Sequence, residues 1–138
     1  MKTMWIARLI VLTCLALLFA PSSTSGHHAT AAEYDISKTV MVKGTITRVD
    51  WSNPHIHIYI DVKGDGRHEE HWAVEFPAPG ATIVAGLSRQ SLMPGTVLTF
   101  EGYPGKPDFH PEAAQDHFAC AKAVTLSDGS HFGFVVGI

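Results

Sequence analysis

The sequence predicts an all-β domain that contains one short helix and five or six strands closed into a small barrel. Three observations predict this architecture. Apolar and polar residues alternate along several short segments, which is typical of half-buried strands. A single segment of helical periodicity interrupts them, and the expected order is three strands, a helix and then further strands. This is the order of an OB-type Greek-key barrel, and a β-sandwich is the alternative.

The first strand is expected over residues 40–51, where β-branched residues are frequent. Val40, Val42 and Ile46 share one parity, whereas Val49 and Trp51 share the other. Because side chains alternate between the two faces of a strand, this change of parity predicts a β-bulge, which we place at the flexible Gly44.

The next two strands are expected to complete an antiparallel meander. A turn at 52–54 separates the first strand from a second one over residues 55–62, in which isoleucine or valine occupies every even position. The glycine-containing segment 63–67 is typical of a hairpin turn, and the third strand follows over residues 71–76.

The second half of the chain begins with the expected helix. Residues 77–80 end the meander, and apolar residues at helical spacing predict a short helix over 81–92. The remaining elements are a fourth strand at 96–103, a proline-containing loop at 104–117, and strands at 118–127 and 131–136.

Length and composition indicate one globular domain. The 138 residues are 46% hydrophobic and 17% charged, which suits a chain that buries a core. Residues 1–26 have the pattern of an export signal, because Lys2 and Arg8 precede an apolar run of 12 residues that is too short to span a bilayer. We therefore expect a periplasmic or secreted protein with no membrane anchor after cleavage, an N-terminal arm at 27–39 and a barrel domain at 40–138.

Cleavage would change the charge and the cysteine content. Removing residues 1–26 takes away two of ten basic residues and none of the 13 acidic ones, so the net charge becomes −5 with neutral histidines. It also removes Cys14, which leaves Cys120 without a partner for an internal disulfide. A negatively charged exported protein is not expected to bind nucleic acid, because that binding depends on phosphate contacts with Lys and Arg. The expected partner is an unidentified protein or small ligand.

Several short motifs are distinctive. They are His27-His28, Ala31-Ala32-Glu33-Tyr34-Asp35, Lys43-Gly44-Thr45-Ile46-Thr47, Trp51-x-Asn53-Pro54-His55, Trp72-Ala73-Val74-Glu75 and Val124-Thr125-Leu126-x-Asp128-Gly129. Together they resemble a family of small exported bacterial proteins of unknown function. The resemblance implies export and a small OB-type barrel, but it carries no established activity and so transfers no catalytic residue. The chain departs from the family pattern at His57 and in the long loop at 104–117.

Histidine is the residue type that most suggests chemistry, with nine copies in the chain. His55 and His57 share one face of the second strand about 7 Å apart, which would let both imidazoles meet one metal ion. The hairpin can bring His71 near this face, and Glu75 could add a carboxylate. These donors suit copper or zinc as a cofactor. Ordinary histidines on the polar face of a sheet are the alternative.

His27 and His28 form a second candidate metal site at the N-terminus. Cleavage after Ser25 would place a histidine third, where the amine, two amides and the imidazole can bind Cu²⁺ in a square-planar site. Cleavage after Gly26 would place His27 first, so that its amine and ring chelate together. Cleavage after Ala31 would remove both histidines.

A binding role without metal or catalysis is the alternative function. The side chains expected to contact a protein or small ligand are Trp51, Asn53, Tyr59 and Tyr103. No nucleophile is accompanied by both a base and an orienting group, so we assign no catalytic residue and do not expect an enzyme.

Overall fold

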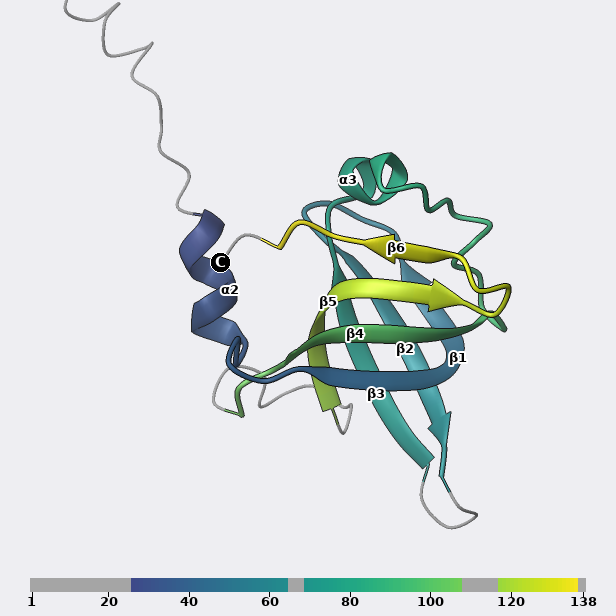
Figure 1. Cartoon of the computed structure of the whole chain (residues 1–138), viewed down its shortest axis with the longest axis horizontal. Coiled ribbons are helices and arrows are strands. Elements are labelled where there is room, and N and C mark those ends of the chain that lie inside the picture. Colours follow the sequence, from purple (N-terminus) through teal and green to yellow (C-terminus); the bar gives the residue numbers. More distant parts are fainter. Residues whose placement is uncertain (1–25, 65–68, 108–116, 137–138) are drawn as a thin grey trace, which may run out of the picture.

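The computed structural model describes residues 26–64, 69–107 and 117–136, and Figure 1 shows their arrangement. The elements in chain order are α2 (Gly26–Glu33), β1 (Val40–Asp50), β2 (Ile56–Lys63), β3 (Glu69–Phe76), α3 (Pro79–Val84), β4 (Val97–Pro104), β5 (His117–Leu126) and β6 (His131–Gly133).

The strands form one continuous sheet in the order β3-β2-β1-β4-β5-β6. Neighbouring strands in this order are antiparallel. An additional parallel pairing between β3 and β5 closes the first five strands into a barrel. The predicted OB-type barrel is thus confirmed, with β6 as an extra strand beside β5 (Figure 1).

β1 is the long strand shared by both halves of the barrel. Its first half pairs with β4 and its second half pairs with β2. The exchange occurs at Thr45, which is in register with Val97 of β4 and with Asp61 of β2. β1 therefore joins the β2–β3 half of the sheet to the β4–β5 half.

The bulge in β1 lies later than predicted. The pairing with β2 shifts between Ile46 and Arg48, so Thr47 is the extra residue and the placement at Gly44 is wrong. The bulge restores the inward direction for Val49, which packs against the same core as Ile46 despite its opposite parity. A β-bulge thus causes the change of parity, as predicted, but it lies at Thr47 instead of Gly44.

Gly44 is required for a close approach of β1 to β2, and this gives a testable prediction. A Cβ atom at this position would lie 2.4 Å from Cγ2 of Ile60 and 2.6 Å from the carbonyl oxygen of Asp61. Gly44→Ala is therefore expected to lower the free energy of unfolding by about 1–3 kcal/mol. Urea unfolding measures this, with Gly80→Ala as the control, because a Cβ atom there meets nothing within 4 Å. Equal unfolding midpoints for the two variants would contradict the close approach.

α3 is shorter than the predicted helix over 81–92. It has Pro79 in its first turn and ends before Gly86, whose φ of +103° is the left-handed conformation that terminates helices. Ile83 and Val84 are exposed, so the apparent helical spacing of apolar residues does not mark a buried helix face.

Three further differences concern the ends of the chain and one loop. β6 covers only His131–Gly133 of the predicted strand at 131–136. α2 was not predicted, because its sequence has no apolar stripe that indicates a helix. Residues 1–25 of the predicted export signal and 108–116 of the predicted loop lie outside the described residues. Within the described ranges, no helix is both long and apolar enough to cross a membrane.

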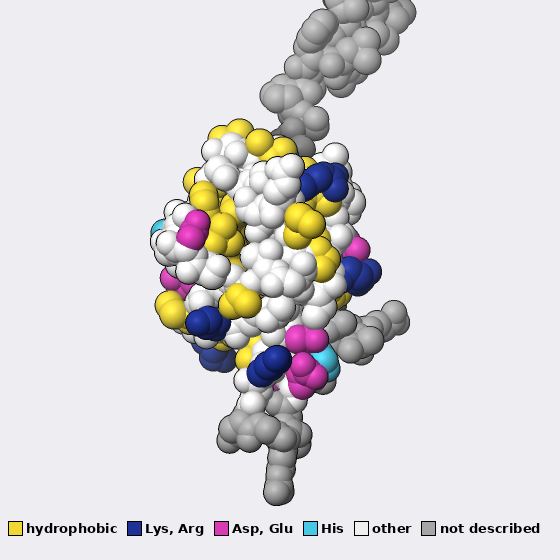
Figure 2. Space-filling model, turned by 90° about the vertical axis from the view of Figure 1, so that its right-hand side faces the viewer, with side chains coloured by type: hydrophobic (Ala, Val, Ile, Leu, Met, Phe, Trp, Pro, Cys, Tyr) yellow, Lys and Arg dark blue, Asp and Glu magenta, His cyan; other side chains and the backbone are white. Residues whose placement is uncertain are grey.

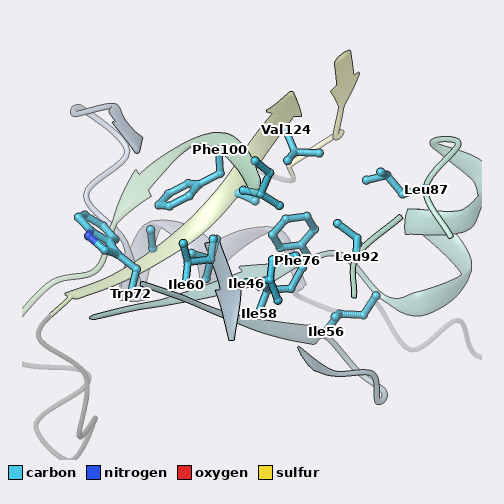
Figure 3. Close-up of a cluster of buried hydrophobic side chains, with 14 residues drawn as sticks. Ile46, Ile56, Ile58, Ile60, Trp72, Phe76, Leu87, Leu92, Phe100 and Val124 are labelled. Atoms are coloured by element: carbon cyan, nitrogen blue, oxygen red, sulfur yellow. The ribbon is translucent and has the colours of Figure 1, made fainter. Parts of the chain in front are cut away.

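The core fills the interior of the barrel and extends toward α3 (Figure 3). Ile56, Ile58 and Ile60 of β2 are fully buried, which confirms the alternation seen in the sequence. Phe100 and Trp72 meet them from β4 and β3 (Figure 3). The odd-numbered residues of β2 and β3 consequently lie on the outer side of the barrel, where the candidate site is found.

Candidate functional site

The N-terminal arm, Gly26–Asp35, attaches to the outside of the barrel through its C-terminal end. Tyr34 forms an isolated β-bridge with Gly105, and the Lys106 amide donates a hydrogen bond of 2.8 Å to the Glu33 carbonyl oxygen. These main-chain contacts place the Tyr34 side chain against the outer face of β3 and β5.

Glu75, on the outer face of β3, bonds to two other side chains. Its Oε2 accepts a hydrogen bond of 2.5 Å from the Tyr34 hydroxyl, and its Oε1 pairs with Nδ1 of His55. Tyr34 is 2% exposed and the Glu75 side chain is 14% exposed, whereas the His55 side chain is 49% exposed. We call these three residues the Glu75 cluster. The cluster presents an accessible imidazole on a largely buried carboxylate.

Aromatic and sulfur side chains surround the Glu75 cluster. The Tyr34 ring stacks on Phe118 of β5 with a centroid distance of 5.7 Å. In the sheet register, Glu75 lies between His57 of β2 and Cys120 of β5. Because residues in register on adjacent strands share a face, these side chains line the outer side of the barrel.

Burial and negative charge raise the pKa values of two groups on this surface. Burial, followed by the charge of Glu75, raises the pKa of the Tyr34 hydroxyl, so this group stays protonated and donates to the carboxylate. Burial, followed by the charges of Glu75 and Glu33, raises the pKa of the Cys120 thiol to about 12. Cys120 is therefore a poor nucleophile at neutral pH.

The raised pKa predicts slow alkylation of Cys120. At about pH 8, iodoacetamide should modify it about tenfold more slowly, or slower still, in the folded protein than in urea, because the thiolate is the nucleophile. Between pH 9 and 12 the unfolded chain loses this proton first, so the thiol makes the folded state less stable as pH rises through that window. Timed alkylation followed by peptide mapping measures the rate. Equal rates in the folded and unfolded protein would contradict the prediction.

A second histidine–carboxylate pair lies further along the same two strands. Nδ1 of His71 is 2.7 Å from Oδ1 of Asp61, and the two residues are in register across β2 and β3. Their side chains are 43% and 30% exposed. This pair is therefore more open to solvent than the carboxylate of the Glu75 cluster.

The structure brings the predicted metal ligands together only in part. His55 pairs with Glu75, whereas His71 pairs with a different carboxylate. In the part of the chain that the structure describes, no three His, Cys, Asp or Glu side chains are grouped so that they could hold a metal ion. The side chains of His27 and His28 lie outside the described residues.

The predicted ligand-contact residues are spread over several elements. Trp51 and Asn53 lie in the loop between β1 and β2, and Tyr59 lies on β2 with the Arg48 guanidinium 3.7 Å from its ring centroid. Tyr103 of β4 is only 8% exposed. The four residues thus come from one loop and two strands, and Tyr103 is largely buried.

Tyr34 is the member of the Glu75 cluster that sequence reasoning missed. It lies before the first strand, in a segment of small and polar residues without strand or helix periodicity. Its partner Glu75 is 41 residues away. A single aromatic residue in that segment is the signal that could have marked it as buried.

Charge is mixed on the face of the molecule that Figure 2 shows. Basic and acidic side chains lie among apolar ones, and acidic, basic and histidine side chains meet in the lower part of this view. No one kind of side chain dominates this face.

A family model matches residues 16–111, with the description "Family of unknown function (DUF6152)". The chain belongs to this family. The matched region contains all three residues of the Glu75 cluster, but the family description assigns them no activity. No curated protein is similar to this chain in sequence.

The solved structures matched by this chain include crystal structures of Rim1, described as mitochondrial single-stranded DNA binding proteins from S. cerevisiae. Forms 1 and 2 have TM-scores of 0.47 and 0.45, are 10% identical, and cover 65% of this chain and 92% and 93% of their own. The sequence-based exclusion of nucleic acid is corrected by this finding, because the matched structures are DNA-binding proteins. At this identity the likeness concerns the fold alone.

Proposed function

We propose that this chain is an exported binding module that binds a transition-metal ion, copper or zinc, at the Glu75 cluster. The observation that carries the proposal is the pairing of Nδ1 of His55 with the Glu75 carboxylate. Metal-binding histidines almost always donate the other ring N–H to a carboxylate, a carbonyl or water, which fixes the ring and its tautomer. Glu75 supplies such a partner to His55.

The pairing leaves Nε2 of His55 available as a metal ligand. An ionised carboxylate only accepts hydrogen bonds, so Nδ1 carries the proton and Nε2 keeps its lone pair. Nε2 is on the opposite side of the ring from Glu75, and the His55 side chain is 49% exposed. A metal ion can therefore approach from solvent.

His55 is better held for this role than His71. The Glu75 side chain is 14% exposed and is fixed a second time by Tyr34, whereas the Asp61 side chain that orients His71 is 30% exposed. A ligand whose supporting partner is itself fixed loses less conformational freedom on binding.

Further donors are part of the proposal, because one imidazole does not fill a coordination sphere. His57 follows His55 by two residues, and His27 and His28 belong to the arm that Tyr34 attaches to the barrel. Imidazole nitrogens together with water suit both copper and zinc.

Calorimetric titration of the purified protein with zinc chloride and with copper chloride tests the proposal. We expect saturable binding of one of the two metals, and a loss of about tenfold or more in affinity for His55→Ala. The matched control is His131→Ala, since His131 pairs with Thr125 on β5 and β6, away from the Glu75 cluster. Equal affinities for the two variants, or no binding to the unchanged protein, would overturn the proposal.

Export is proposed on the charge and hydropathy pattern of residues 1–26. When the chain is expressed with its own N-terminus in a bacterial host, N-terminal sequencing of the periplasmic fraction should begin at Gly26, His27 or Ala32. Protein that stays in the cytoplasm with Met1 in place would contradict export.

A second candidate function is the binding of a protein or small ligand without metal. It is favoured by the partly buried ring of Trp51 in the loop before β2, whose centroid lies 4.9 Å from the Arg89 guanidinium. An aromatic ring beside a cation is a common anchor at binding surfaces. Trp51→Ala should then abolish capture of the partner while leaving metal affinity unchanged.

A further inference from the structure

The arm is held on the barrel mainly by its last residues. Asp35 donates its amide to the Pro104 carbonyl oxygen at 2.8 Å, and Nζ of Lys106 donates to the Ala31 carbonyl oxygen at 2.6 Å. The arm can open as a unit against these hydrogen bonds and the burial of Tyr34.

Tyr34 is the arm residue whose side chain is buried against the outer surface of the barrel. Its ring is 2% exposed and lies nearly parallel to Phe118, at an interplanar angle of 16°. Its hydroxyl reaches one oxygen of Glu75, and the other oxygen of the same carboxylate faces His55. A single side chain thus joins the arm to the proposed metal ligand.

We propose that docking of the arm and metal binding at His55 are coupled through Glu75, so that metal binding stabilises the docked position of the arm. This inference rests on the proposed function. Both hydrogen bonds end on one carboxylate, so fixing one of them orients the acceptor for the other. Reciprocity requires that a metal ion which stabilises the docked arm binds more tightly when the arm is docked.

The direction of the coupling follows from the geometry of the carboxylate. With Tyr34 in place, Glu75 is kept away from water and aimed at His55, which holds the imidazole in the tautomer that a metal needs. With the arm detached, Glu75 can rotate and accept hydrogen bonds from water. The imidazole then loses its fixed orientation, and metal affinity falls.

Hydrogen exchange of the arm and zinc affinity together test the coupling. In the unchanged protein, zinc should slow amide exchange in the peptide 26–39 by about fivefold or more. Tyr34→Phe keeps the ring on Phe118 but removes the hydroxyl donor, so it should weaken zinc binding by the same factor and abolish the effect of zinc on exchange. Thr125→Val is the control, because it removes a hydroxyl that bonds to His131 rather than to Glu75.

A second variant tests the coupling without removing the Tyr34 hydroxyl. Lys106→Ala loosens the arm at Ala31 without touching Glu75, so it should also weaken zinc binding, by a smaller factor. Zinc that slows arm exchange equally in His55→Ala would show a different metal site and overturn the coupling. Unchanged zinc affinity in both Tyr34→Phe and Lys106→Ala would overturn the coupling and leave the metal site standing. Absence of zinc and copper binding in the unchanged protein would overturn both.

Discussion

Phe100→Ala is expected to lower the free energy of unfolding by about 3–5 kcal/mol, the range typical of a buried phenylalanine. Phe100 of β4 is fully buried, and its ring packs edge-on against Trp72 of β3 at a centroid distance of 5.5 Å. It therefore joins two strands that are not neighbours in the sheet. Alanine would leave a cavity in the middle of the barrel that the closed sheet cannot fill by collapse.

Urea unfolding followed by far-ultraviolet circular dichroism measures this loss. Met41→Ala is the control, because Met41 is 72% exposed on β1 and its truncation should change stability by about 0.5 kcal/mol or less. If the two variants unfold at the same urea concentration, Phe100 is not a central element of the core.

Glu75→Gln should weaken metal binding by about 10- to 100-fold, as is typical when the partner of a metal-binding histidine is removed. Glutamine keeps an acceptor oxygen at only one of the two carboxylate positions, so it cannot accept at both the position that meets the Tyr34 hydroxyl and the one that meets Nδ1 of His55. Its NH₂ group would face one of these two donors. Glutamine has nearly the same size as glutamate, so a loss of metal affinity would reflect the lost orientation of His55 and not a change in packing.

Calorimetric titration measures the effect of Glu75→Gln, and Glu101→Gln is its matched control. Glu101 of β4 is also a carboxylate with a fixed partner, Lys122 at 2.8 Å, and its replacement changes the net charge equally. We expect Glu101→Gln to bind metal as the unchanged protein does. If the two variants lose affinity equally, the effect is one of overall charge and Glu75 has no special role.

The barrel could be predicted because its core depends on local patterns. Isoleucine at alternate positions of β2 marks the inner face without reference to any other strand. The position of the bulge could not be predicted, because it depends on how β1 exchanges one partner strand for another near Thr45. The end of α3 is set by the left-handed conformation of Gly86, which the apolar spacing around it does not show.

The candidate site could be predicted for His55 and Glu75 but not for Tyr34. The residue type and spacing mark His55, and the sequence also indicates that Glu75 can reach its face. The attachment of Tyr34 to Glu75 depends on where the arm crosses the barrel, and that path is fixed by main-chain contacts with Gly105 and Lys106. Contacts of this kind carry no pattern in the sequence.

The measurement that tests the metal site most directly is a long-range proton–nitrogen spectrum of the histidine rings, recorded with and without one equivalent of zinc or copper(I). The His55 signals, assigned with His55→Ala, should show the proton on Nδ1 before metal is added, because the Glu75 carboxylate accepts from that atom. The metal should then shift the Nε2 resonance of His55 and leave the proton on Nδ1. A proton on Nε2 in the metal-free protein, or an Nε2 resonance that neither metal moves, would contradict binding at the Glu75 cluster.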